Sequence, residues 1–560
     1  MFKKTDPNPQ LDIFTAPSMQ LGSRASKKYS DPNAWHNQFY SLVTTKINEE
    51  IFKPLFPEGK KCGRPNASIR ILVAMSALKE GFGCSDEDLF EKCEFDLLTR
   101  KALGVELLTD VTPSIDTYYL FRRRICEYQE RTGIDLMQLC FEQLAGNQVR
   151  LLKISGKCVR MDSKLIGSNI ARQSRYELIH TTLVKFLKTC TLSDLSPEQE
   201  ERAKEYLKED SSKTVYRSDS DTLQSNLARI GNFIMEMLAT FPATSPAHDL
   251  LQRLFDEQYA VKDGKAVLRD KKEVKADSLQ NPNDPDATYR AKNDQKVQGY
   301  VTNITETVEE GKPNIITSVQ VETAVFADCH FLQEAVENSE RVTDSTIEDL
   351  YADGAYQSPD NREFAKNHNA MQLKTGKMQG GCRWELIPHD EDGLTVREIA
   401  TGNTYEAVKA VTKQGSRKRW RIPWNNKTGW RYFEDKDIKA YQLRKQIESL
   451  PLEEQHKRNN VEAAMFQYSF HTRKGKTRYR GLLKHRMHAY SRCMWMNLRR
   501  MVIFQISTFQ RSIFALFGPI REAFGSFKAI SRKIFTSGAD CYVSLRMTTL
   551  ARLDSKYVPF

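Results

Sequence analysis

The spacing of apolar residues changes once along this chain, near residue 156, and this change constrains the fold more than any other feature. Before it, apolar residues recur every three or four positions, as in the run 69–81, which is the period of an amphipathic helix. From 156 to 164 apolar and polar residues alternate, which is the period of a β-strand. Strand-like runs follow at 297–307 and 314–326. A helical unit followed by strands with helices between them indicates an α/β fold.

The chain has 560 residues, which at about 100–200 residues per domain predicts three or four folding units. A helical, charge-rich stretch follows the first strand, and a later stretch holds four tryptophans separated by turn signals. We therefore expect a sheet domain with one helical and one β-rich insert. The expected units are a flexible lead-in at 1–35, a helical DNA-binding domain at 36–150, a sheet domain at 151–505 with inserts at about 172–290 and 380–435, and a helical tail at 506–560.

Lysine and arginine outnumber acidic residues by 84 to 72, so the formal net charge is +12 at pH 7. Such an excess favours a polyanionic partner. The N-terminal segment lacks the apolar core of a secretion signal, and the most apolar run, 501–517, is interrupted by polar residues, so we expect neither export nor a membrane span. The eleven cysteines form no C-x-x-C pair, which predicts reduced thiols in the cytoplasm and no structural zinc site.

Three acidic residues stand in contexts typical of a catalytic site. Asp162 lies inside the alternating run, Asp353 follows an apolar approach to a turn, and Glu462 is the only acid between residues 457 and 500. Alone, each has an ordinary interpretation, such as a surface or turn aspartate, or a glutamate paired with Arg458. Together they suggest converging carboxylates, which need cations, usually two divalent ions about 3.5–4 Å apart. No P-loop motif is present, so ATP hydrolysis has no support.

Around these acids the chain resembles the DDE transposases of bacterial insertion sequences, of the InsH-like type, over about residues 40–505. The residues at 159–163 resemble the strand of the first acid, those at 351–356 resemble the segment of the second, and 458–466 resembles the family's Arg-x-x-x-Glu helix. The family pattern often has Tyr at the place of Gln455 and Lys at the place of Ser469.

The N-terminal part adds two further points of resemblance. Gly63-Arg64-Pro65, followed by the helical run, resembles the beginning of the family's DNA-binding domain. Arg122-Arg123-Arg124 resembles its arginine-rich closing helix, although a solvated arginine face is the ordinary interpretation of such a cluster.

The resemblance implies an RNase H-like fold, a mixed sheet with helices on both faces. It implies that Asp162, Asp353 and Glu462 are catalytic and bind two Mg²⁺ ions, for which Mn²⁺ can substitute, and that Arg458 contacts DNA or orients Glu462. The implied function is a transposase that binds the ends of an insertion sequence and catalyses metal-dependent DNA cleavage and strand transfer. Its implied partners are the double-stranded terminal repeats and target DNA, bound by a homodimer associated with the bacterial nucleoid. An inactive DNA-binding protein derived from a transposase, and a host RNase H-like nuclease, are the alternatives.

Two basic segments are further candidates for DNA contacts. At 416–424 basic residues interleave with Trp420 and Trp424, which either stack on an unpaired base or form the small core of the insert. Between 457 and 500 twelve residues are Lys or Arg. We expect those that lie off the apolar stripe of this helix to face DNA, with a merely solvated basic face as the alternative: Lys484, Arg486, Arg492, Arg499 and Arg500. The predicted DNA-binding residues are Arg64, Arg122, Arg123, Arg124, Trp420, Trp424, Arg458, Arg473, Lys474, Lys476, Arg478 and Arg480.

Overall fold

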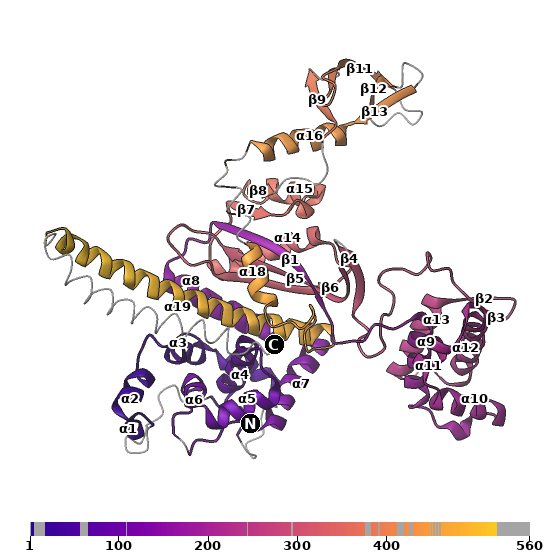
Figure 1. Cartoon of the computed structure of the whole chain (residues 1–560), viewed down its shortest axis with the longest axis horizontal. Helices are drawn as coiled ribbons and strands as arrows, with labels where there is room; N and C mark the ends of the chain where they lie inside the picture. The colour runs from indigo at the N-terminus through magenta and orange to yellow at the C-terminus, as the bar shows by residue number, and fades with distance from the viewer. Residues whose placement is uncertain are drawn as a thin grey trace.

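The computed structural model describes a mixed α/β protein with one central sheet, helices on both of its faces and two inserts (Figure 1). The described residues are 2–4, 17–56, 65–107, 109–242, 245–292, 295–375, 382–389, 393–410, 419–424, 429–449, 451, 454, 457 and 461–523. For Ser18, Trp424 and residues 509–523 only the backbone is described. The predicted DNA-binding residues Arg64 and Arg458 lie outside the described residues.

A bundle of helices forms the N-terminal part of the chain. Its helices are α1 (Pro17–Gln20), α2 (Ser23–Tyr29), α3 (Trp35–Leu42), α4 (Ile69–Phe82), α5 (Asp86–Phe95), α6 (Leu97–Leu103), α7 (Ile115–Thr132) and α8 (Leu136–Leu152). Ser85 and Asp88 cap α5 reciprocally, each side chain accepting a hydrogen bond from the other's amide. The prediction of a flexible lead-in is wrong for residues 17–30, which form α1 and α2. They are ordered because Tyr29 is buried and its carbonyl bonds the ring of His36.

The central sheet is mixed. Its strands are β1 (Cys158–Gly167), β4 (Thr288–Lys292), β5 (Gln295–Thr307), β6 (Ile316–Thr323), β7 (Asp349–Ala352) and β8 (Gln372–Thr375). β5 is antiparallel to β1 on one side and to β4 and β6 on the other. β1 is parallel to β7, and β7 is parallel to β8. β1 therefore lies in the middle of the sheet, between an antiparallel and a parallel neighbour.

Helices cover both faces of this sheet. On one face α14 (Leu332–Thr343) and α15 (Pro359–Asn367) pack on apolar residues of β1 and β7. On the other face lie α18 (Val461–Ser469) and the long helix α19 (Leu482–Ala523). The N-terminal helices pack against α19, so they share one apolar core with this face of the sheet (Figure 1).

The helix α19 connects the N-terminal helices to the sheet. One face of this helix is apolar, and Met487, Tyr490, Met494 and Met501 on it are all buried. Gly81 of α4 lies directly against the ring of Trp495, where a Cβ atom would have no room. The predicted boundary at 505/506 falls inside this unbroken helix, because the sequence has neither Pro nor Gly between residues 482 and 517. Within the described residues, no helix is long and apolar enough to span a membrane.

The helical insert has a core of its own. Its elements are α9 (Arg175–Leu187), α10 (Pro197–Lys208), α11 (Ser211–Arg217), α12 (Ser220–Thr240), α13 (Pro246–Gln258), β2 (Tyr259–Lys262) and β3 (Lys265–Leu268). The insert also contains a short hairpin, which the expectation of a helical insert did not include. Asp263 and Gly264 adopt positive φ angles and close a two-residue turn that pairs β2 with β3.

The β-rich insert is an antiparallel five-stranded sheet that lies away from the central sheet (Figure 1). Its elements are β9 (Trp384–His389), β10 (Gly393–Glu398), β11 (Thr404–Ala410), β12 (Arg419–Trp424), β13 (Gly429–Glu434) and the following helix α16 (Asp435–Glu448). Trp384, Trp420 and Phe433 are buried in its core.

Candidate active site

The parallel pairing of β1 with β7 brings two of the predicted carboxylates together. The register pairs Val159 with Leu350 and Arg160 with Tyr351. β7 ends at Ala352, so Asp353 directly follows it, and it lies near enough to Asp162 for its charge to raise the pKa of that carboxyl. Continued two residues past Arg160 and Tyr351, the register would put both carboxylates on one face of the sheet.

Contacts on either side of Asp162 identify this face as the one covered by α18. Arg160 donates a hydrogen bond to the carbonyl of Lys457, ahead of α18, at 2.9 Å. Lys164 donates from Nζ to the hydroxyl of Ser469, at the end of α18, at 2.7 Å. Because alternate residues of a strand share a face, Asp162 lies on the same side as Arg160 and Lys164 and faces α18.

The surroundings of Asp162 disfavour its ionised form. Burial raises the pKa of this carboxyl to about 6, and repulsion from Asp353 and Asp328 acts in the same direction. The amide of Ser163, which donates to Oδ1 at 2.8 Å, and the more distant Lys292 offset part of this effect. The site therefore concentrates negative charge in a poorly solvated place, which is an arrangement common at functional sites.

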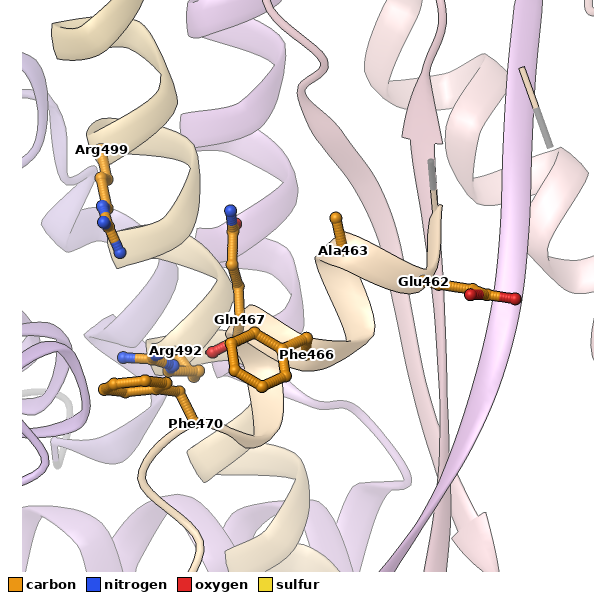
Figure 2. A pocket seen from close by; sticks show the side chains of 7 residues that line it. All are labelled: Glu462, Ala463, Phe466, Gln467, Phe470, Arg492 and Arg499. Carbon is orange, nitrogen blue, oxygen red and sulfur yellow. Dashed lines mark hydrogen bonds between the residues drawn. The ribbon is translucent and has the colours of Figure 1, made fainter. Parts of the chain in front are cut away.

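Glu462 occupies the first turn of α18. Its side chain is exposed, and Figure 2 shows it projecting away from Arg492 and Arg499 and, in this view, across a strand of the sheet. In the described part of the chain, no three His, Cys, Asp or Glu side chains lie close enough together to hold a metal ion. The structure thus pairs Asp162 with Asp353 and does not place Glu462 in a group with them.

The predicted arginine cluster of α7 divides into three different environments. Arg122 lies over the rings of Tyr118 and Tyr479, at 5.4 and 5.1 Å from their centroids, and joins α7 to the loop before α19. Arg123 is exposed and pairs with Glu127 at 3.4 Å. Arg124 lies 5.9 Å from the ring centroid of Phe56. Of the three, Arg123 is the side chain most accessible to a ligand.

The loop between α18 and α19 presents a group of exposed cations. Arg473 and Lys476 exchange two backbone hydrogen bonds of 3.0 Å around a tight turn at Lys474 and Gly475. The amide of Gly167 donates to the carbonyl of Gly475, so this turn lies beside the end of β1. The side chains of Arg473, Lys474, Arg478 and Arg480 are exposed, although Arg478 and Arg480 also donate to the carbonyls of Gly83 and Asn169. Lys476 is less exposed and donates to the carbonyl of Ile170. We call these four exposed side chains the basic loop.

The arginines of α19 differ from the prediction. Arg486 pairs with Glu322, Arg492 donates to the carbonyls of Glu80 and Gln467, and Arg500 pairs with Glu306. Their charges are used inside the protein because α19 lies in the middle of the shared core. The prediction of a DNA-facing surface is therefore wrong for these three arginines, whereas Lys484 is exposed.

In the β-rich insert the two predicted tryptophans do not form an exposed pair. Trp420 is buried in the core of the insert, which agrees with the structural alternative for this residue. The side chain of Trp424 lies outside the described atoms. Trp430, which the structural alternative assigned to the core, is exposed, as is Tyr432, which no prediction named. Arg421 and Arg419 lie over their rings at 4.3 and 4.5 Å. The alternation of residues 429–434 was the available signal, because every second residue of a strand shares a face.

Comparison with known proteins identifies the N-terminal helices. Residues 28–124 match the family model described as Transposase domain (DUF772), which covers under a fifth of the chain. Comparisons with curated proteins and with solved structures returned no match. The match begins at the end of α2 and ends inside α7, next to Arg124.

Proposed function

We propose that this chain, whose N-terminal helices match a transposase domain, is a DNA transposase with an RNase H-like catalytic domain. The observation that supports the proposal is the pairing of β1 with β7, together with the nearness of Asp353 to Asp162, whose pKa it helps to raise. The mixed strand order, with helices on both faces, supports the proposed fold. The transposase match supports the reaction class of DNA cleavage and strand transfer.

Asp162 and Asp353 suit a divalent cation by their chemistry. Carboxylate oxygens are the ligands that Mg²⁺ and Mn²⁺ prefer, and a bound cation would relieve the repulsion that raises the pKa of Asp162. We propose that these two residues hold Mg²⁺, in a two-ion site that Glu462 completes from the first turn of α18. Such ions activate the attacking oxygen and stabilise the leaving oxygen in phosphodiester chemistry.

Other residues of the chain would position this chemistry. The contacts of Arg160 with Lys457 and of Lys164 with Ser469 hold both ends of the α18 segment on β1, which fixes the place of Glu462. The basic loop, which lies beside the end of β1, would hold backbone phosphates of double-stranded DNA near the carboxylates. Joining two element ends to a target favours a homodimer in the DNA complex.

A cleavage and strand-transfer assay on labelled element ends tests this function. We expect Asp162→Asn, Asp353→Asn and Glu462→Gln each to lower cleavage at least 10³-fold in Mg²⁺ while end binding is kept. Glu348→Gln, which changes an exposed acid just before β7, serves as the matched control and keeps full activity. Wild-type activity in Asp353→Asn would contradict the assignment. End binding without cleavage by the wild type would favour the inactive DNA-binding protein, and cleavage without joining would favour the nuclease.

A further inference from the structure

A cavity of about 450 Å³ opens between α18 and α19, on the side of α18 away from the aspartates. Its walls combine aromatic, amide and cationic groups in a way that the proposed chemistry does not use (Figure 2). Its lining includes Glu462, Phe466, Gln467, Phe470, Arg492 and Arg499. Glu462 stands at its edge and projects out of it, so the cavity borders the proposed active site.

Two phenylalanines give this cavity an exposed aromatic wall. Phe466 is 63% exposed and Phe470 38% exposed, which is unusual for such large apolar side chains. Their ring centroids are 5.9 Å apart at an interplanar angle of 69°, and Figure 2 shows the Phe466 ring nearly face-on. The two rings are therefore close together and steeply inclined to each other in the lining of the cavity.

Arg499 adds a positive charge to the lining, and the buried Arg492, already hydrogen-bonded within the protein, closes the cavity beside it. Arg492 is held in place by hydrogen bonds to the carbonyls of Glu80 and Gln467, at 2.9 and 2.5 Å. Arg499, two turns further along α19, also lines the cavity. An aromatic face next to fixed positive charge is the combination that binds unstacked nucleotides, because the base stacks while the phosphate is neutralised.

We infer that this cavity binds one unpaired nucleotide of the DNA strand that passes the carboxylates. Its base stacks on Phe466 and Phe470, and its phosphate lies toward Arg499. Phe466 follows Glu462 by one helical turn, so the bound nucleotide would be a neighbour of the one under reaction. This inference rests on the proposed function, since it names a further contact of the same DNA strand. A protein segment in the same cavity is the competing occupant, but Arg499 in the lining favours an anion.

Binding of defined oligonucleotides to the full chain tests the inference. The probes are a blunt duplex and the same duplex with a single-stranded 3′ extension that carries 2-aminopurine. We expect the wild type to bind the extended duplex about tenfold more tightly and to quench the 2-aminopurine fluorescence, as stacking requires. The double variant Phe466→Ala/Phe470→Ala should lose both the preference and the quenching, while its affinity for the blunt duplex is unchanged. Arg499→Gln should weaken the preference and keep the quenching.

Tyr216→Ala is the matched control, because Tyr216 is an exposed aromatic residue in the helical insert. It should behave as the wild type does. A preference and quenching that survive in the double variant would overturn the inference and leave the proposed function standing. Light scattering measures the oligomeric state of the double variant. A changed oligomeric state, together with an intact preference for the extended duplex, would likewise overturn the inference in favour of a protein occupant. A wild type that binds neither duplex would instead refute the proposed function.

Discussion

Two charged groups on the same face of β1 have opposite environments, although only one residue separates them. Arg160 is 3% exposed, and its Nε donates to Glu306 at 2.6 Å. Glu306 is fully buried and forms a second ion pair with Arg500 at 2.6 Å. Asp162 instead has Asp353 and Asp328 among its near charges, and its pKa is raised to about 6.

This contrast separates structural charge from functional charge. At Arg160 the protein supplies the countercharge itself and joins β1, β5 and α19 through one buried network. At Asp162 the neighbouring charges include two further carboxylates, so the folded chain keeps the energetic cost of burying an ionised carboxylate near like charges. A fold has no structural reason to keep such a cost, whereas a site that receives a cation does.

Breaking the network at Arg160 should have the largest effect on stability. Glu306→Gln leaves two buried arginines without their carboxylate, so we expect the free energy of unfolding to fall by about 3–5 kcal/mol. Chemical denaturation of the full chain measures this change. As the control, Glu348→Gln removes the exposed pair with Lys157 and should cost under about 1 kcal/mol. Equal effects of the two substitutions would show that the buried network has no special weight.

The neighbouring carboxylate should respond in the opposite direction. Because the folded chain raises the pKa of Asp162 from 3.8 to about 6, the wild type loses stability as the pH rises through this range. Asp162→Asn keeps the oxygen that accepts from the amide of Ser163 but cannot ionise. In EDTA the free energy of unfolding of this variant should equal that of the wild type near pH 4. At pH 8 it should exceed the wild-type value by up to about 3 kcal/mol. A variant less stable than the wild type at pH 8 would mean that the ionised carboxylate is already compensated.

The salt dependence of DNA binding should distinguish surface cations from cations in the core, and this is the smallest of the three expected effects. Replacing the four side chains of the basic loop by Gln should reduce the slope of log K against log[salt] for DNA binding by up to about 3–4 units. The control removes Lys204, Lys208, Lys213 and Arg217, which are exposed in an insert (172–290) with 18 basic and 20 acidic residues. It should leave the slope unchanged. A loop variant with the wild-type slope would place the DNA elsewhere.

Local signals in the sequence were enough for most elements of the fold. Alternation predicted β1, a strand-like run predicted β5, and the helical spacing of residues 69–81 predicted α4. Tertiary contacts decided the rest. Residues 17–30 are ordered by the burial of Tyr29, and the hairpin of β2 and β3 lies in a stretch whose polar composition concealed it.

The candidate site was predictable only in part. The contexts of Asp162 and Asp353 in the sequence anticipated their positions at β1 and β7, but their register required the sheet. The charge count around Glu462 did not distinguish Arg492 and Arg500, which the core uses, from the exposed side chains of the basic loop. Burial separates these two groups, and burial depends on how α19 packs rather than on any local pattern.

The central claim is that Asp162 and Asp353 form a cation site, and thermal unfolding with and without Mg²⁺ at pH 8 tests it most directly. A ligand that binds only the folded chain raises its stability with the logarithm of ligand concentration. We predict that the unfolding temperature of the wild type rises steadily with Mg²⁺, and that Asp162→Asn and Asp353→Asn abolish this rise while Glu348→Gln preserves it. An equal rise in the two aspartate variants and the wild type would contradict the account.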